Sequence, residues 1–110
     1  MSLSTHVLDT SSGAPAANVP LRLKHGLITL FEGTTDSDGR CAALKALQLV
    51  SGGYRLEFEV AEYFRAQGHD LPFPPFLDVI GIDFGMAEAS AHYHVPLLVS
   101  PYGYSTYRGS

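Results

Sequence analysis

Apolar and polar residues alternate along several short stretches of this chain, and the alternation predicts β-strands. In the clearest stretch, from Tyr54 to Val60, apolar Tyr, Leu, Phe and Val alternate with charged Arg and Glu. This two-residue period is typical of a strand with one buried and one solvated face. Val19, Leu21 and Leu23 alternate with polar or proline neighbours in the same way. Weaker patterns of the same kind predict further strands over 3–9, 27–31, 42–47, 76–84, 91–99 and 104–108.

Turn sequences rich in Gly, Ser, Asp and Pro separate these stretches, and only residues 61–67 predict a helix. That helix has two turns at most, and Gly68 after it is a residue that commonly ends helices. About eight short strands and one short helix predict an all-β fold, an antiparallel β-sandwich. Because no repeat or linker divides the chain, residues 1–110 are expected to form a single domain.

The predicted strand 91–99 does not have one apolar and one polar face, as a half-buried strand normally does. One face carries the apolar set Ala91, Tyr93, Val95, Leu97 and Val99, and the other carries His92, His94, Pro96 and Leu98. A face that combines imidazoles with apolar side chains suits a subunit interface or a ligand-lined groove. A short turn separates this strand from 104–108, so we expect a hairpin that returns the last residues alongside His94.

The composition and charge of the chain argue against nucleic acid and membrane as binding partners. With 45% hydrophobic and 16% charged residues, the chain can form a folded core. A net charge of −4 argues against nucleic-acid binding, which needs clustered Lys and Arg. We expect no membrane partner, because His, Tyr and Pro interrupt the long uncharged stretch 89–107. The first residues lack a secretory signal, so a cytoplasmic location is expected, although a mature periplasmic form fits the same residues.

His92 and His94 are the first candidates for chemistry. Alternate residues of a strand lie about 6.6–6.8 Å apart on one face, a spacing found in zinc sites. A zinc ion would need a third ligand, from Cys41 or a distant carboxylate. The simpler interpretation is one hydrogen-bonded, partly buried imidazole and one solvated imidazole. Cys41 is the only cysteine, which excludes an internal disulfide, and it is interpreted as a small buried side chain.

His6 and Arg40 are the next candidates. His6 shares a face of the predicted strand 3–9 with Ser4, and taken alone it is more often structural than functional. Arg40 follows the turn 36–39, where its guanidinium could bind an anionic or carbonyl oxygen. That turn lacks the oxygen ligands of a calcium loop.

Four blocks of the sequence resemble the 5-hydroxyisourate hydrolases, also called transthyretin-related proteins. The most specific block is 92–110, which ends in Tyr-Arg-Gly-Ser, and the others are 3–16, 35–40 and 53–64. Transthyretin itself, the hormone carrier on the same fold, lacks this tetrapeptide and has other residues at the positions of His6, Arg40 and His94. The segment 24–34 is shorter than in many relatives.

The resemblance implies a transthyretin-like sandwich of two four-stranded sheets with one short helix. It also implies a homotetramer, a dimer of dimers with active sites at the mouths of a central channel. The implied reaction converts 5-hydroxyisourate, a product of urate oxidation, to 2-oxo-4-hydroxy-4-carboxy-5-ureidoimidazoline, without cofactor or metal. The catalytic set carried over is His6, Arg40, His94 and Ser110. The substrate-binding set is Tyr107, Arg108 and Gly109, to which we add His92 because it shares a face with His94.

These residue types suit the hydrolysis of a cyclic amide. Either His6 or His94 could activate water as a base of near-neutral pKa, and the two could act as a coupled pair. Arg40 could stabilise the charge that develops on the attacked carbonyl oxygen. The alternative is non-catalytic binding of a small aromatic ligand in the channel, as in transthyretin; a third interpretation is a structural or zinc-binding sandwich.

Overall fold

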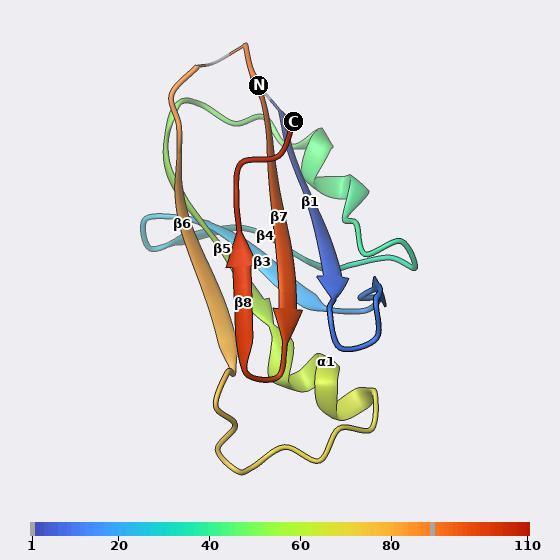
Figure 1. Cartoon of the computed structure of the whole chain (residues 1–110). Coiled ribbons are helices and arrows are strands. Elements are labelled where there is room, and N and C mark those ends of the chain that lie inside the picture. The colour runs from blue at the N-terminus through green and yellow to red at the C-terminus, as the bar shows by residue number, and fades with distance from the viewer. Residues whose placement is uncertain (1, 89) are drawn as a thin grey trace.

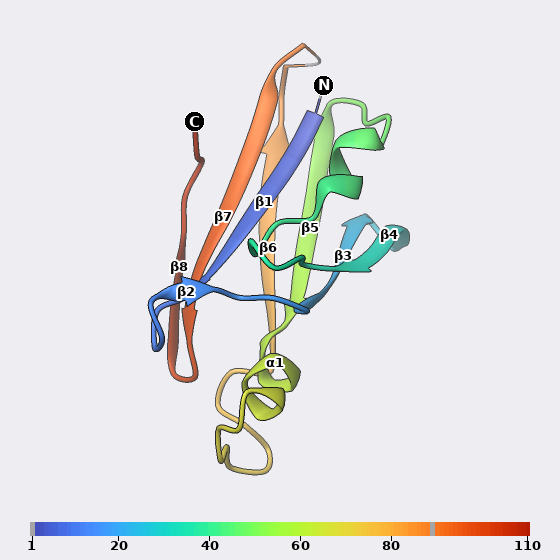
Figure 2. The same cartoon turned by 90° about the vertical axis from the view of Figure 1, so that its right-hand side faces the viewer.

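The computed structural model describes residues 2–88 and 90–110, which form two stacked sheets of four strands each. The first sheet has the strand order β2-β1-β7-β8 and the second has the order β4-β3-β5-β6. Figure 2 shows the two layers side by side. The strands are β1 (Ser2–Asp9), β2 (Ala14–Pro15), β3 (Pro20–His25), β4 (Ile28–Thr34), β5 (Gly52–Glu59), β6 (Val79–Met86), β7 (His92–Ser100) and β8 (Gly103–Thr106). The helical segments are the 3-10 helix η1 (Ala42–Ala46) and the α-helix α1 (Val60–Ala66).

The predicted all-β sandwich with a short helix is confirmed. Helix α1 begins one residue before the predicted range, directly after β5. Gly68 ends it with a φ of 92°, a left-handed conformation that glycine adopts without strain. The amide of His69 then donates to the carbonyl of Phe64 at 3.0 Å, which completes a Schellman cap.

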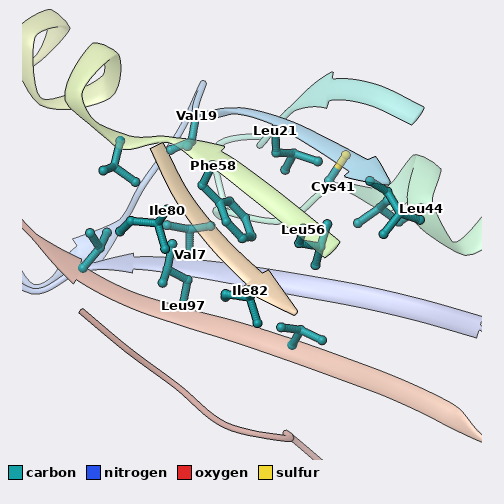
Figure 3. Close-up of a cluster of buried hydrophobic side chains, with 14 of the residues drawn as sticks. Val7, Val19, Leu21, Cys41, Leu44, Leu56, Phe58, Ile80, Ile82 and Leu97 are labelled. Carbon is teal, nitrogen blue, oxygen red and sulfur yellow. The ribbon is translucent and has the colours of Figure 1, made fainter. Parts of the chain in front are cut away.

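The hydrophobic core lies between the two sheets (Figure 3). Val7 and Leu97 of the first sheet and Leu56 and Phe58 of the second are all fully buried there. The predicted core face of 91–99 is confirmed, since its Tyr and both Val residues are also buried. The local alternation of the sequence therefore identified which faces of β3, β5 and β7 pack inward.

A buried polar contact ties α1 to β1. The hydroxyl of Tyr63 donates to the carboxylate of Asp9 at 2.8 Å, and both residues are buried. Burial by itself raises the pKa of Asp9, but hydrogen bonds from Ser11 and Tyr63 outweigh it and the pKa is lowered. Burial and the neighbouring Asp9 raise the pKa of Tyr63. The carboxylate therefore stays ionised and hydrogen-bonded inside the fold.

Two predicted strands are corrected by the structure. Residues 42–46 form η1, because only Leu44 of this run is buried, whereas a strand would bury alternate residues. Residues 76–78 precede β6 rather than belong to it. The carbonyl of Asp78 accepts hydrogen bonds from the amides of Val60 and Ala61, so this segment covers the start of α1 instead of extending the sheet.

The first sheet is mixed, which corrects the expectation of purely antiparallel sheets. β1 and β7 run parallel, with Ser4 opposite His94 and His6 opposite Pro96, whereas every other pair of described strands is antiparallel. The chain enters β7 from β6 of the other sheet, so no hairpin dictates its direction relative to β1. The predicted hairpin is confirmed, because β8 pairs with β7. No helix among the described residues is long and apolar enough to cross a membrane.

Candidate functional site

Two β-bridges join residues from four separate segments along β1 and β7. Figure 1 shows the starts of β1 and β7 and the C-terminal tail at the same end of the molecule, opposite α1. His6 of β1 forms a β-bridge with Arg40, and His94 of β7 forms another with Gly109 of the tail. The fold therefore brings the predicted His and Arg residues and the tetrapeptide into one region.

The turn before Arg40 is held tightly against β1. The amide of Val7 donates to the carbonyl of Gly39 at 2.8 Å. A Cβ at Gly39 would lie 2.4 Å from the carbonyl oxygen of Val7, and its φ is 74°, so only glycine fits there. The carboxylate of Asp36 accepts from the amide of Arg40 at 3.0 Å, as in the predicted turn. These contacts fix the position of the Arg40 main chain beside β1.

His94 is half-buried and hydrogen-bonded, whereas His92 is exposed. The hydroxyl oxygen of Ser4 lies 2.7 Å from Nδ1 of His94 and 3.0 Å from Nε2 of His92. The amide of Gly109 donates to the carbonyl of His94 at 2.8 Å. This agrees with the simpler sequence interpretation of the two imidazoles. Ser4 was not among the predicted site residues, although the alternation placed it on the same strand face as His6.

Burial and neighbouring positive charge lower the pKa of His94. Loss of hydration on burial has the largest effect, followed by the charges of Arg40, His6 and His92. A hydrogen bond with the main chain of Ser4 acts in the opposite direction. The net result keeps the imidazole neutral at neutral pH, which is the form that can accept a proton.

The C-terminal tail borders a pocket of about 210 Å³ next to His94. Tyr107 and Arg108 line it together with residues of β6 such as Phe84, which was not among the predicted site residues. The guanidinium of Arg108 lies 4.3 Å from the ring centroid of Tyr93, a cation–π contact that orients the tail. The side chains of Tyr107 and Ser110 are exposed and make no hydrogen bond with the described residues. The pocket therefore has His94 on one side and the tetrapeptide on another.

A second pocket, of about 120 Å³, is lined by Ser4, which contacts His94, and by Arg40, which is bridged to His6. Lys45 of η1 also lines it and was not identified from the sequence. Residues 42–47 were predicted to form a strand, so the sequence did not indicate that Lys45 borders the same pocket as Arg40. Arg40 and Lys45 outnumber the one carboxylate on the lining of this pocket, that of Asp36, and this net positive charge suits a carbonyl oxygen that gains negative charge.

The described residues do not support the zinc interpretation. They contain no group of three or more His, Cys, Asp or Glu arranged to hold a metal ion. Nitrogens of His92 and His94 are instead hydrogen-bonded to Ser4. Cys41 is buried as predicted, and loss of hydration raises the pKa of its thiol, so it is a poor nucleophile.

The comparisons with known proteins agree with the resemblance found in the sequence. Residues 3–109 match the model of the HIUase/Transthyretin family. A 5-hydroxyisourate hydrolase of Caulobacter vibrioides is 53% identical over 98% of this chain and 97% of its own length. One of Mesorhizobium japonicum is 54% identical over 98% and 91%.

Solved structures show the same likeness. The Klebsiella pneumoniae 5-hydroxyisourate hydrolase superposes with a TM-score of 0.85 at 38% identity, over 98% of this chain and 92% of that one. Sea bream transthyretin in complex with thyroxine gives a TM-score of 0.87 at 30% identity, over 99% and 95%. The matched family and the transthyretin-like fold confirm the resemblance. The chain belongs to the HIUase/transthyretin family.

Proposed function

We propose that this protein hydrolyses 5-hydroxyisourate to 2-oxo-4-hydroxy-4-carboxy-5-ureidoimidazoline in urate catabolism, acting as a single domain over residues 1–110 without a cofactor. Relatives that carry this activity in their names are about half identical to it over nearly their full length. The observation that carries the proposal is the position of His94, which feels the charges of Arg40 and His6 and is bridged to Gly109 of the terminal tetrapeptide. A cytoplasmic location is part of the same proposal.

The proposed reaction adds water to a ring carbonyl. A neutral imidazole, of His6 or His94, takes a proton from water as the water oxygen bonds to the carbonyl carbon. Arg40 stabilises the negative charge on the former carbonyl oxygen. The bond between that carbon and the ring nitrogen then breaks, the nitrogen accepts the proton held by the imidazole, and the resulting carboxylic acid releases its remaining proton to the solvent to become a carboxylate. The lowered pKa of His94 supports this scheme, because a protonated imidazole could not act as the base.

The tail residues are assigned to substrate and water binding. The hydroxyl of Ser110 positions the water or the substrate. Tyr107 and Arg108 form a wall of the pocket beside His94, while Gly109 holds the tail against β7. His92 completes the binding set on the face that it shares with His94.

We also propose a homotetramer, a dimer of dimers whose central channel opens at these sites. The mixed face of β7 and the exposed rings of Tyr104 and Tyr107 support it, because large apolar side chains outside a core commonly mark interfaces. Light scattering at micromolar concentration is expected to give four times the chain mass, and a monomer would contradict the proposal. No nucleic-acid or membrane partner is proposed.

The activity is tested by following the decay of 5-hydroxyisourate, made freshly from urate with urate oxidase. The protein at submicromolar concentration is expected to accelerate decay well beyond the spontaneous rate. His94→Ala and Arg40→Ala are each expected to lose about 10²–10⁴ of the rate, the scale of one acid–base or oxyanion group. Matched controls are His69→Ala, beside Phe64 at the far end of the fold, and Arg65→Ala in α1.

Two outcomes would contradict the proposal. Near-wild-type rates in both site variants would refute the site assignment. No acceleration by the folded, assembled wild type would refute the activity and favour the aromatic-ligand alternative, which the likeness to a thyroxine-bound transthyretin supports.

A further inference from the structure

Four polar side chains form a continuous hydrogen-bonded row across the β1–β7 pair. Ser2 Oγ lies within hydrogen-bond distance of His92 Nδ1, His92 Nε2 lies 3.0 Å from Ser4 Oγ, and Ser4 Oγ lies 2.7 Å from His94 Nδ1. The parallel register places Ser2 opposite His92 and Ser4 opposite His94 on the face away from the core. From Ser2 the row passes through the exposed imidazole of His92 and ends at the half-buried imidazole of His94.

The number of protons on the row means that all its hydrogen bonds must point the same way along it. The hydroxyl of Ser4 has one proton, so it donates to one imidazole and accepts from the other. When both imidazoles are neutral, two arrangements are possible. In the first, His94 Nδ1–H donates to Ser4, Ser4 donates to His92, and Nε2 of His94 is unprotonated. In the second, every donor is reversed, and Nε2 of His94 carries the proton.

Nε2 of His94 is the ring nitrogen left for the substrate. Nδ1 is occupied by Ser4, and the Cδ2 edge of the ring packs on Gly109 so closely that a Cβ there would lie 2.3 Å away. Among the described residues, no hydrogen bond uses Nε2. The two arrangements of the row therefore correspond to His94 as a base and His94 as an acid.

We propose that Ser4 is a positioning residue that relays protons between His94 and His92, an inference that rests on the proposed hydrolysis. When Nε2 of His94 takes a proton from the attacking water, its Nδ1 proton passes to Ser4. The Ser4 proton passes in turn to Nε2 of His92, which holds it. The reverse transfer returns a proton through Nε2 of His94 to the leaving ring nitrogen. No proton is gained or lost over the cycle.

The surrounding charges explain why such a relay helps. The charged and titratable groups that border the row are His6, Arg40, Asp36, Lys45, His92 and Arg108. Most of them are basic, so an imidazolium at His94 would lie in an unfavourable positive field. Transfer to the exposed His92 moves that charge toward water, where hydration stabilises it.

Ser4→Ala tests the relay through a readout that a structural role would not change. We expect kcat to fall about 10- to 100-fold with little change in KM, a smaller loss than that of the base itself. In mixtures of H2O and D2O, the wild-type rate is expected to fall along a curve because several protons move together. Ser4→Ala is expected to give a straight line, and Ser4→Thr, which keeps the hydroxyl, is expected to restore the curve.

The neighbouring residue provides a matched control. Thr5 is buried on the opposite face of β1, and its hydroxyl donates to the carbonyl of Val95 at 2.7 Å. Thr5→Val removes a buried hydroxyl from the same strand without touching the row, so the curve is expected to persist. His92→Phe is expected to resemble Ser4→Ala, and the double variant to be no worse than either single variant. If Ser4→Ala fails to fold, His92→Phe carries the test, because it removes the group that receives the relayed proton.

A second measurement separates this proposal from the proposed activity. In nitrogen NMR spectra of the imidazoles, Ser4→Ala is expected to change the fractions of the Nδ1–H and Nε2–H tautomers of His94, because the hydroxyl that fixes Nδ1 is removed, whereas Thr5→Val leaves them unchanged. Unchanged tautomer fractions in Ser4→Ala, or a curved isotope plot in that variant, would overturn the relay even if the protein is active. A wild type that does not hydrolyse 5-hydroxyisourate would refute the activity, whereas a changed tautomer in Ser4→Ala would still support the hydrogen-bonded row.

Discussion

Gly109→Ala probes how tightly the tail must fit against the site. The added Cβ would lie 2.3 Å from Cδ2 and 3.1 Å from Cγ of His94. Carbon atoms in contact prefer about 3.5–4.0 Å, so a displacement of more than about 1 Å is required. The main-chain conformation of Gly109 is an ordinary one, so only the missing space requires glycine there.

The tail, rather than His94, is expected to move. His94 belongs to the nine-residue strand β7, which is paired on both sides and backed by the core. The tail is mostly exposed, and its Gly109 amide makes one hydrogen bond of 2.8 Å to β7. Losing that bond costs about 0.5–1.5 kcal/mol, far less than distorting a central strand. Thermal stability should therefore change little, while Ser110 is displaced from the site.

The activity should be far more sensitive than the stability. A misplacement of about 1 Å can cost about 10²-fold in rate, so we expect a loss of that size in the decay of 5-hydroxyisourate. Gly103→Ala, in the hairpin before the tail, is the matched control, because its Cβ would meet only Ser100 Oγ at 3.9 Å. Wild-type turnover by Gly109→Ala would refute the tight packing of the tail on His94. Equal losses of turnover in Gly109→Ala and Gly103→Ala would show that the effect does not depend on the contact between Gly109 and His94.

Three further predictions concern pH and stability. Burial and then the charge of Arg40 lower the pKa of His94, so the hydrolysis rate should fall in acid only below the ordinary histidine pKa of about 6.5. Arg40→Gln removes one of these causes, so its residual activity should fall at a higher pH than that of the wild type. Tyr63→Phe should cost about 1–3 kcal/mol in chemical denaturation at pH 7, with turnover unchanged. This cost should shrink in acid. The pKa of Asp9 is lower in the folded than in the unfolded protein, so its carboxylate stabilises the fold fully above the unfolded pKa of about 3.9. That stabilisation is lost as the pH falls through the pKa of Asp9 in the folded protein. Leu44→Ala should cost about 2–5 kcal/mol by leaving a cavity under η1, and an unchanged melting curve would contradict that burial.

Local patterns determined much of the fold. The alternation from Tyr54 to Val60 identifies β5 and its buried face, because side chains of a strand point to opposite sides whatever surrounds it, although Val60 itself begins α1. Gly68 marks the end of α1 for an equally local reason, its left-handed φ. The tetrapeptide and the residues around His6, Arg40 and His94 also indicated the family directly, because those blocks can be matched without knowledge of the structure.

Other features depended on contacts between distant segments. A weak alternation predicted a strand over residues 42–47, but residues 42–46 form a 3-10 helix in which only Leu44 is buried and Lys45 borders the Arg40 pocket. Residues 76–78 leave the sheet because the carbonyl of Asp78 bonds to the start of α1. No pattern within either segment encodes these partners.

The arrangement of the site was decided in the same way. The sequence placed His92 and His94 on one face and Ser4 on the same face as His6, but it did not relate the two strands. The parallel register of β1 and β7 sets Ser4 opposite His94 and within hydrogen-bond distance of both imidazoles. Strand direction and register depend on how the whole chain passes between the sheets, so only the tertiary structure could join the two sets of residues into one site.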